Sequence, residues 1–227
     1  MNTEEILTYL SELEQNNNRE WYHAHKTQLQ QANAEFESLI QELILEIGKT
    51  DSSILSNNPK VLTFKLVRDT RFSNDKSPYN PSFRAHISSA GKLPIPVGYF
   101  IAIRPNNRTF LGGGLFASMF KDATSMIRDY IVEHGEEFES ILTAPDFKDN
   151  FSVIGEELKN VPKGYDADHP QAKYLKNKSW YLEYPISDTL LIDSDRFIRE
   201  AVQKYEIMQP FNAFLNKALV GFNMPSR

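Results

Sequence analysis

The sequence has no cysteine among its 227 residues. Disulfide frameworks, thiolate metal sites, iron–sulfur clusters and a cysteine nucleophile are therefore excluded. The chain also lacks a run of about 20 apolar residues, which a membrane-spanning helix requires. Its first five residues, MNTEE, show neither the basic start nor the apolar core of a secretory signal. We therefore expect a cytoplasmic protein with no membrane attachment.

An excess of positive charge is missing as well. Lys and Arg together number 25 and Asp and Glu number 30, which gives a formal net charge of −5. This balance weighs against attraction of the whole molecule to nucleic acid or to an anionic membrane, and leaves only a local basic face open. Hydrophobic residues make up 41% of the chain, which is ordinary for a globular protein with a sizeable core.

Familiar catalytic and metal-binding motifs are missing too. The sequence has no G-x-S-x-G elbow, no dinucleotide fingerprint, no Walker A pattern and no H-E-x-x-H motif. His23 and His25 are two residues apart, whereas ligands on one helical face need a spacing of three or four. We therefore predict no metal site built by the protein alone.

Helical periodicity dominates both ends of the chain. Apolar residues recur at helical spacing over 4–14, 19–47, 118–134 and 136–142, and again from Ser194 onward. Pro210 is expected to restart or kink the last helix, since proline fits the first helical turn. Residues 144–177, with their prolines and Gly164, are expected to be irregular.

The middle of the chain changes to strand patterns. Five segments are predicted as strands, namely 61–67, 83–87, 97–104, 108–111 and 179–186. Helices precede and follow these segments without alternating with them, so we predict an α+β fold. In it, an antiparallel sheet packs against N-terminal and C-terminal helices. No linker-like stretch divides the chain, so we expect one domain over residues 1–227.

The most unusual segment is 60–84, which has six basic and two acidic residues in a chain of net charge −5. Arginine offers a planar fork suited to carboxylate or phosphate, and lysine offers a point charge. We predict an anion site in which cations neutralise the ligand, and these are Arg68, Arg71, Lys76 and Arg84. Three further residues would fix its geometry, namely Asp69, Asp75 and Tyr79. The alternative is a salt-bridged loop with a purely structural role.

A second basic segment, 159–178, has five lysines and two aspartates. Lys163 and Lys176 are further candidates for binding the anion if the two basic segments meet. His169, in the sequence Asp168-His169-Pro170, could act as a general acid or base because histidine titrates near neutral pH. The alternative is a helix start that Asp168 caps.

Glycines and aromatic residues give weaker signals. Gly112-Gly113-Gly114 could let backbone amides approach a phosphate, or could simply end the strand pair before it. Aromatic residues interleave with the basic segment, as in a base-stacking groove, and these are Phe72, Tyr79, Phe83 and Tyr99. Because the net charge opposes that interpretation, nucleic acid is not an expected partner.

The spacing R-D-x-R-F-x-x-x-K-x-x-Y, which runs from Arg68 to Tyr79, resembles the signature of the DUF2461 family. The similarity covers nearly the whole chain and includes the segments NNNREW at 16–21, GGGL at 112–115 and PKGY at 162–165. One departure is Lys65, which stands where the family pattern has arginine and so removes a bidentate contact there. The resemblance implies an uncharacterised protein, and it supplies no activity, substrate or catalytic residue.

We therefore expect a protein that binds a small molecule carrying phosphate or carboxylate at a basic cleft. If a reaction occurs there, the candidates for acid–base chemistry are His169, Asp69 and Asp75. No cofactor is expected, except Mg²⁺ that could enter with a phosphorylated ligand. The alternative is a non-catalytic interaction protein in which the 68–79 segment is a salt-bridge network. The sequence does not fix the oligomeric state.

Overall fold

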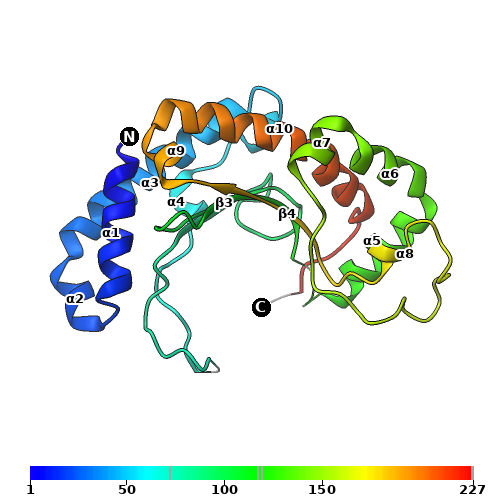
Figure 1. The fold of residues 1–227 in the computed structure, drawn as a ribbon, viewed down its shortest axis with the longest axis horizontal. Helices are drawn as coiled ribbons and strands as arrows, with labels where there is room; N and C mark the ends of the chain where they lie inside the picture. The colour runs from blue at the N-terminus through cyan, green and yellow to red at the C-terminus, as the bar shows by residue number, and fades with distance from the viewer. Residues whose placement is uncertain (72, 117, 119, 226–227) are drawn as a thin grey trace. The chain divides into compact units, whose positions relative to one another are not determined.

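The computed structural model describes residues 1–71, 73–116, 118 and 120–225 (Figure 1). Its helices are α1 (Thr3–Gln15), α2 (Arg19–Ala24), α3 (Lys26–Ile47), α4 (Pro59–Leu62), α5 (Lys121–Glu133), α6 (Gly135–Thr143), α7 (Pro145–Asn150), α8 (Ala172–Leu175), α9 (Asp188–Ile192) and α10 (Ser194–Ala218), with a short 3₁₀ turn at Ser52–Ile54. Phe72, part of the motif described above, lies outside the described residues.

One antiparallel sheet of four strands joins β1 (Phe83–Ile87), β2 (Tyr99–Ile103), β3 (Thr109–Leu115) and β4 (Trp180–Ile186), in that order. Helices lie before, between and after these strands. The predicted α+β class is therefore confirmed.

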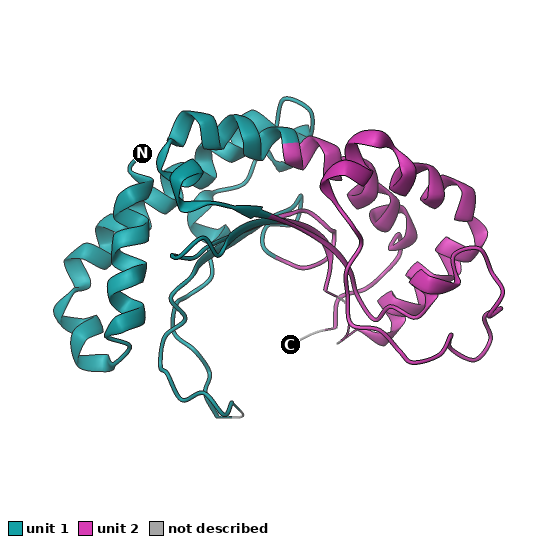
Figure 2. Cartoon of the chain, viewed as in Figure 1, with its two compact units in different colours: residues 1–92, 100–111, 185–203 teal, residues 93–99, 112–184, 204–227 magenta. Residues whose placement is uncertain are grey.

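The chain divides into two compact units (Figure 2). Unit 1 consists of residues 1–92, 100–111 and 185–203, and unit 2 of residues 93–99, 112–184 and 204–227. The basic segment 60–84 belongs to unit 1, whereas the basic segment 159–178 belongs to unit 2. The assignment of one domain to residues 1–227 stays a prediction.

The core of unit 1 forms where the apolar faces of α1 and α3 pack against β1. Leu10, Phe36 and Ile40 are fully buried, and the ring of Phe36 lies 5.3 Å from that of Phe83 in β1. The 3.6-residue spacing of the apolar residues in α3 puts them on the face that packs inward. This packing fixes β1, the strand in which the basic segment 60–84 ends.

The core of unit 2 is a cluster of aromatic rings. Phe138 of α6 lies 5.0 Å from Phe214 of α10 and 5.2 Å from Tyr174 of α8, measured between ring centroids. Trp180 of β4 is fully buried and donates its indole N–H to the carbonyl of Tyr174. The cluster therefore ties α8, which lies in the second basic segment, to the rest of unit 2.

The prediction of a strand over 61–67 is wrong. The Asn58 side chain accepts a hydrogen bond from the Lys60 backbone N–H, and Pro59 follows as the first residue of α4. This turn of helix takes up Val61 and Leu62, where the strand was predicted to begin. Pairing survives only as isolated antiparallel bridges, between Thr63 and Ala85 and between Val67 and Tyr79.

The expected single helix over 19–47 is interrupted at His25, so two helices replace it. His25 has φ −103°, and its backbone N–H donates to the Trp21 carbonyl, which ends α2. The imidazole ring also stacks on the Trp21 indole, with centroids 4.0 Å apart. A stacked pair at the junction stabilises the break that apolar periodicity alone does not reveal.

Gly112-Gly113-Gly114 does not end the strand pair but lies inside β3. Gly114 has φ +87°, and a Cβ there would meet the carbonyl oxygen of Trp180 at 2.3 Å. The glycine therefore serves the close approach of β3 and β4.

Pro210 lies inside the single helix α10 and does not restart it. Its neighbours Met208 and Phe211 are fully buried, so packing on both sides of the proline keeps the helix continuous. Residues 144–177, expected to be irregular, contain the short helices α7 and α8. Asp168 does not cap α8, because that helix begins at Ala172 after Gln171.

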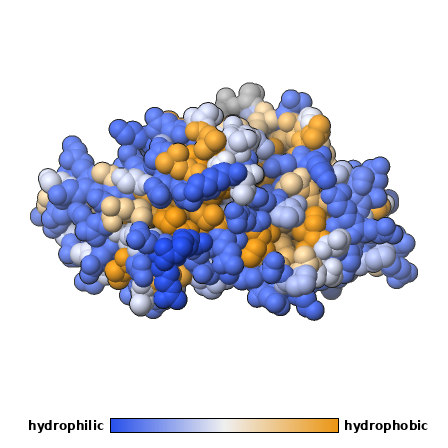
Figure 3. Space-filling view, turned by 90° about the horizontal axis from the view of Figure 1, so that it is seen from above, coloured by the Kyte–Doolittle hydropathy of each residue, from blue (hydrophilic) through white to orange (hydrophobic). Residues whose placement is uncertain are grey.

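Among the described residues, no helix is both long enough and apolar enough to cross a membrane. The face of the protein drawn in Figure 3 is mostly hydrophilic, with hydrophobic residues gathered in a few patches.

Candidate functional site

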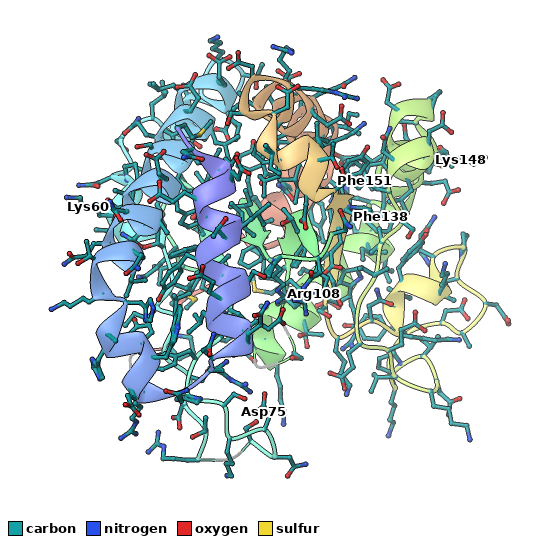
Figure 4. All side chains as sticks on the ribbon, turned by 60° about the vertical axis from the view of Figure 1, so that its left-hand side comes forward. Lys60, Asp75, Arg108, Phe138, Lys148 and Phe151 are labelled. Atoms are coloured by element: carbon teal, nitrogen blue, oxygen red, sulfur yellow. The ribbon has the colours of Figure 1, made fainter. Side chains whose placement is uncertain are left out.

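Unit 1 contains a hollow of about 360 Å³, which we call the arginine hollow. Three structural elements contribute to it, namely the C-terminal end of α1, the loop from 63 to 82 and the region around the β2–β3 turn. Figure 4 labels Asp75 on the loop and Arg108 beside the turn. The lining residues are Glu14, Arg68, Asp75, Asn80, Pro81, Arg104 and Arg108.

The β2–β3 turn is held in place by two asparagines with left-handed backbone conformations. Asn106 has φ +66° and Asn107 has φ +57°, which asparagine tolerates better than most residues. The Asn106 backbone N–H donates to the Asp188 carboxylate at 2.9 Å, and the Asp188 backbone N–H donates to the Asn107 side chain at 2.9 Å. This reciprocal pair fixes the turn and so positions Arg104 and Arg108 at the hollow.

Two of the three arginines in the hollow already face a carboxylate. Arg108 donates from one nitrogen to both oxygens of Glu14, at 2.7 Å each. Arg68 forms an ion pair with Asp75 across the loop. The hydrogen bond from Arg68, followed by bonds from Ser77, holds the pKa of Asp75 well below its usual range. Asp75 is therefore a carboxylate at neutral pH.

Within the part of the chain that the structure describes, Arg104 is the arginine of the hollow that forms no ion pair with a carboxylate. Its guanidinium is 5.5 Å from the centre of the Phe110 ring, and its Nε donates to the Ser82 hydroxyl at 3.4 Å. Burial, and secondarily the charge of Arg104, lowers the pKa of neighbouring Arg84. A positive field therefore remains beside Arg104.

Tyr79 serves as an anchor for the loop and does not line the hollow. The Asn17 side chain donates to the Tyr79 carbonyl at 2.9 Å and accepts from its backbone N–H at 3.1 Å. The Tyr79 ring stacks on Tyr22 at a centroid distance of 3.8 Å, and the residue is 5% exposed. These contacts fix the end of the loop, from which Arg68, Asp75, Asn80 and Pro81 line the hollow.

The other predicted residues of the loop point elsewhere. Arg71 pairs with Asp69 through a fork of hydrogen bonds of 2.6–3.1 Å, on an exposed part of the loop. This pairing lowers the pKa of Asp69. Lys76 donates to the Thr70 carbonyl at 3.0 Å, and Arg84 donates to the Lys65 carbonyl at 3.3 Å. None of these side chains lines the arginine hollow.

Unit 2 contains a larger hollow, of about 840 Å³, that His169 lines. His169 Nδ1 accepts from the Gln171 backbone N–H at 3.0 Å, so a neutral ring has its proton on Nε2. Lys163 and Lys176 do not line this hollow. Its charged lining residues are mostly acidic, namely Glu133, Glu136, Glu137 and Glu139. An anion would therefore be repelled from the surroundings of His169.

Tyr165 attaches the second basic segment to α5. The Tyr165 hydroxyl donates a hydrogen bond to the carboxylate of Asp129, a residue of α5, at 2.7 Å. Burial, followed by this hydrogen bond and the negative charge of Asp129, raises the pKa of Tyr165 to about 12. The native state therefore holds this proton more tightly than the unfolded chain does.

Replacing Tyr165 with phenylalanine is expected to lower the free energy of unfolding at neutral pH, because the bond to Asp129 is lost. The stability difference between wild type and variant should shrink as the pH rises from 10, the ordinary tyrosine pKa, towards 12, the pKa of Tyr165 in the folded protein. In this range the Tyr165 hydroxyl of the unfolded wild-type chain has lost its proton and that of the folded protein has not, which favours unfolding. Urea unfolding of both proteins across this range measures the gap between them. A gap that stays constant would contradict the assignment.

Of the residues that line the arginine hollow, Arg68 and Asp75 were predicted from the sequence, whereas Arg104, Arg108 and Glu14 were not. The available signal was the turn sequence Pro105-Asn106-Asn107, which lies between Arg104 and Arg108. Glu14 is an ordinary helix residue in the sequence, and only its bond to Arg108 distinguishes it.

Among the described residues, no group of three or more His, Asp or Glu side chains is arranged to hold a metal ion. A family model described as a conserved hypothetical protein, DUF2461, matches residues 5–214. Comparison with curated proteins gives no match, and comparison with solved structures gives none.

Proposed function

The chain belongs to the DUF2461 family, as its sequence motifs predicted, and within that fold we propose that it binds a small molecule carrying phosphate or carboxylate in the arginine hollow. The observation that carries the proposal is the charge of the lining. Three guanidinium groups face two carboxylates there, and Arg104 has neither of them as a partner. An anionic group of the ligand beside Arg104 would supply the third negative charge and so match the three guanidinium groups.

Geometry and size support the same ligand class. A guanidinium can donate two parallel hydrogen bonds to a carboxylate or phosphate, which gives both affinity and orientation. A volume of about 360 Å³ is at the lower end of small-molecule sites, so it suits a compact anion. Glu14 and Asp75 compete with the ligand for Arg108 and Arg68, and binding would rearrange these exposed pairs at little energetic cost.

The proposal is one of binding, in a protein that we expect in the cytoplasm. Asp75, the carboxylate candidate that lines the hollow, has a depressed pKa, so at neutral pH it is neither a proton donor nor an effective general base. If the ligand is phosphorylated, Mg²⁺ entering with it could use the oxygens of Asp75 and Glu14.

The test is a thermal-shift titration of the full chain with inorganic phosphate, a sugar phosphate and a short dicarboxylate. We expect a saturable rise in melting temperature with at least one of these compounds. Replacing Arg104 with glutamine should weaken binding about 10-fold or more, because a hydrogen bond to a charged group is worth about 1.5–3 kcal/mol.

The matched control is Arg71→Gln, which removes one exposed arginine from the same unit but leaves the lining of the hollow intact. Binding should survive this change. If Arg71→Gln abolishes binding and Arg104→Gln does not, the anion site is the exposed loop and the arginine hollow is rejected. The absence of a shift with every anion rejects both.

The alternative is a non-catalytic interaction protein whose 68–79 segment is a structural network. One observation favours it, namely that charged side chains of the loop find partners within the loop: Arg68 with Asp75, Arg71 with Asp69 and Lys76 with the Thr70 carbonyl. On this hypothesis Arg68→Gln lowers the melting temperature whether or not an anion is added. Exposed pairs contribute only about 0–1 kcal/mol each, so the expected drop is small.

A further inference from the structure

Three phenylalanine rings form a row on unit 1, which we call the phenylalanine row. They are Phe64, in the segment after α4, Phe100 of β2 and Phe110 of β3. Centroid distances are 6.4 Å from Phe64 to Phe100 and 5.8 Å from Phe100 to Phe110. All three residues are partly exposed, in contrast to their neighbours Ile101 and Leu111, which are fully buried.

The row lies on the side of the sheet opposite to the core of unit 1. Successive residues of a strand point to opposite faces, so Phe100 and Phe110 face away from the side that buries Ile101 and Leu111. Figure 1 labels β3, the strand that carries Phe110. The sheet therefore presents partly exposed aromatic surface on this side.

Cations flank the row at both ends. The Arg84 guanidinium and the Lys92 ammonium lie 5.6 Å and 5.7 Å from the centre of the Phe64 ring. The Arg104 guanidinium lies 5.5 Å from the centre of the Phe110 ring. The strand sequences FRAHI, YFIAI and TFLGGGL contain no aspartate or glutamate. The fourth strand, β4, contributes Glu183, which belongs to unit 2. Within unit 1, the row is therefore bordered by three cations, and its own strands contain no carboxylate, in a chain of net negative charge.

We propose that the phenylalanine row binds single-stranded nucleic acid, with bases stacked on its rings and phosphates contacting Arg84, Lys92 and Arg104. Aromatic side chains on a sheet and cations that follow the backbone are the two requirements for such binding. The base faces needed for stacking are exposed in a single strand and hidden in a duplex. An uncharged apolar partner would leave the three cations without counter-charge, so the charge pattern favours a polyanion.

The aromatic residues that interleave with basic residues in the sequence are not those of the row, and one of them, Phe72, lies outside the described residues. Tyr79, Phe83 and Tyr99 interleave with basic residues in the chain, but they are only 5%, 2% and 3% exposed and pack in cores. The net charge of −5 then weighed against nucleic acid. The fold instead gathers other phenylalanines, together with cations from three separate segments, on one face.

This proposal goes beyond anion binding in the arginine hollow and shares only Arg104 with it. The two can be tested separately, because the three rings, Arg84 and Lys92 do not line the hollow. Because the Phe110 ring contacts the Arg104 guanidinium, the separating variant is Phe100→Leu, which should leave phosphate or dicarboxylate binding unchanged.

The experiment measures the fluorescence anisotropy of labelled oligothymidylate and oligouridylate with the full chain at low salt. An unlabelled duplex of the same length serves as competitor. We expect both single strands to bind and the duplex to compete poorly. Three phosphate contacts predict a slope of about −2 in a plot of the logarithm of the binding constant against the logarithm of the salt concentration.

Phe100→Leu and Phe110→Leu remove the stacking surface and keep an apolar side chain. Each should weaken binding about 5-fold to 100-fold, the range expected for one base–aromatic contact. Phe222→Leu, at a partly exposed ring of unit 2, is the matched control and should have no effect. Lys92→Ala should reduce the salt slope by about 0.7, whereas Lys49→Ala on the same unit should not.

Melting temperatures of all variants separate loss of binding from loss of folding. If a leucine variant unfolds, the conservative Phe110→Tyr, which keeps the ring, should retain binding. Failure of both single strands to bind at low salt overturns the proposal. Binding that survives both leucine substitutions, or a duplex that competes as well as the single strand, also overturns it.

Discussion

Replacing Arg128 with methionine is expected to lower the free energy of unfolding by about 3–5 kcal/mol, because two buried acceptors lose their donors. Arg128 lies on α5 and is 8% exposed. Its guanidinium donates to the carbonyl of Leu175 at 2.8 Å and to that of Asn177 at 2.7 Å. Methionine has similar bulk but cannot donate to either oxygen.

Urea-induced unfolding at constant pH measures this loss as a lower midpoint with an unchanged slope. Arg199→Met, at an exposed arginine of α10, is the control and should change stability by less than about 0.5 kcal/mol. Arg128→Lys should recover only part of the loss, because one ammonium cannot reproduce the planar fork. An Arg128→Met protein as stable as the wild type would show that these bonds do not stabilise unit 2.

This arginine also shows why charge alone is a poor guide to a site. Burial lowers the pKa of Arg128, and the cation is held by backbone carbonyls and lies 5.9 Å from the ring of Trp180. Its hydrogen bonds fasten the end of the second basic segment to α5. We therefore interpret Arg128 as a structural residue and not as a ligand for an anion.

Replacing Gly114 with alanine is expected to cost more than about 3 kcal/mol of unfolding free energy. The residue has φ +87°, which L-residues with a side chain adopt at a cost of about 1–2 kcal/mol. An added Cβ would also lie 2.3 Å from the Trp180 carbonyl oxygen and 2.6 Å from the Tyr181 Cα. Because both obstacles are backbone atoms, β3 and β4 would have to move apart.

Gly164→Ala is the matched control for backbone strain. Gly164 has φ +99°, but nothing lies within 4 Å of the position that its Cβ would occupy. Alanine there should cost only the conformational part, about 1–2 kcal/mol. The difference between the two variants in thermal or urea unfolding therefore measures the steric part. Equal losses would contradict the close approach of the two strands.

Much of the fold was predictable because it follows from local pattern. The apolar stripe of residues 4–14 predicted α1 within a residue at each end, and the short apolar runs predicted β1, β2 and β4. The errors have local causes that periodicity does not detect. Pro59 starts a helical turn where alternation suggested a strand, and His25 stacks on Trp21 at a break in a continuous stripe.

The candidate site was predictable only in part. The density of charge in 60–84 identified Arg68 and Asp75, which do line the arginine hollow. It also identified Arg71 and Lys76, whose side chains bond within the loop. Arg104 and Arg108 were not predicted because they lie outside any cluster of basic residues in the sequence, and only the β2–β3 turn brings them to the loop.

By itself the sequence determined the family, the α+β class and most element positions, because motif spacing and apolar periodicity are properties of neighbouring residues. It also fixed the local excess of positive charge in 60–84. Only the tertiary structure decided which charges share a surface. Glu14, Arg68 and Arg108 come from distant parts of the chain, and their meeting depends on how α1, the loop and the β2–β3 turn pack. The same holds for the phenylalanine row, because the face that a ring occupies is set by which side of the sheet is buried.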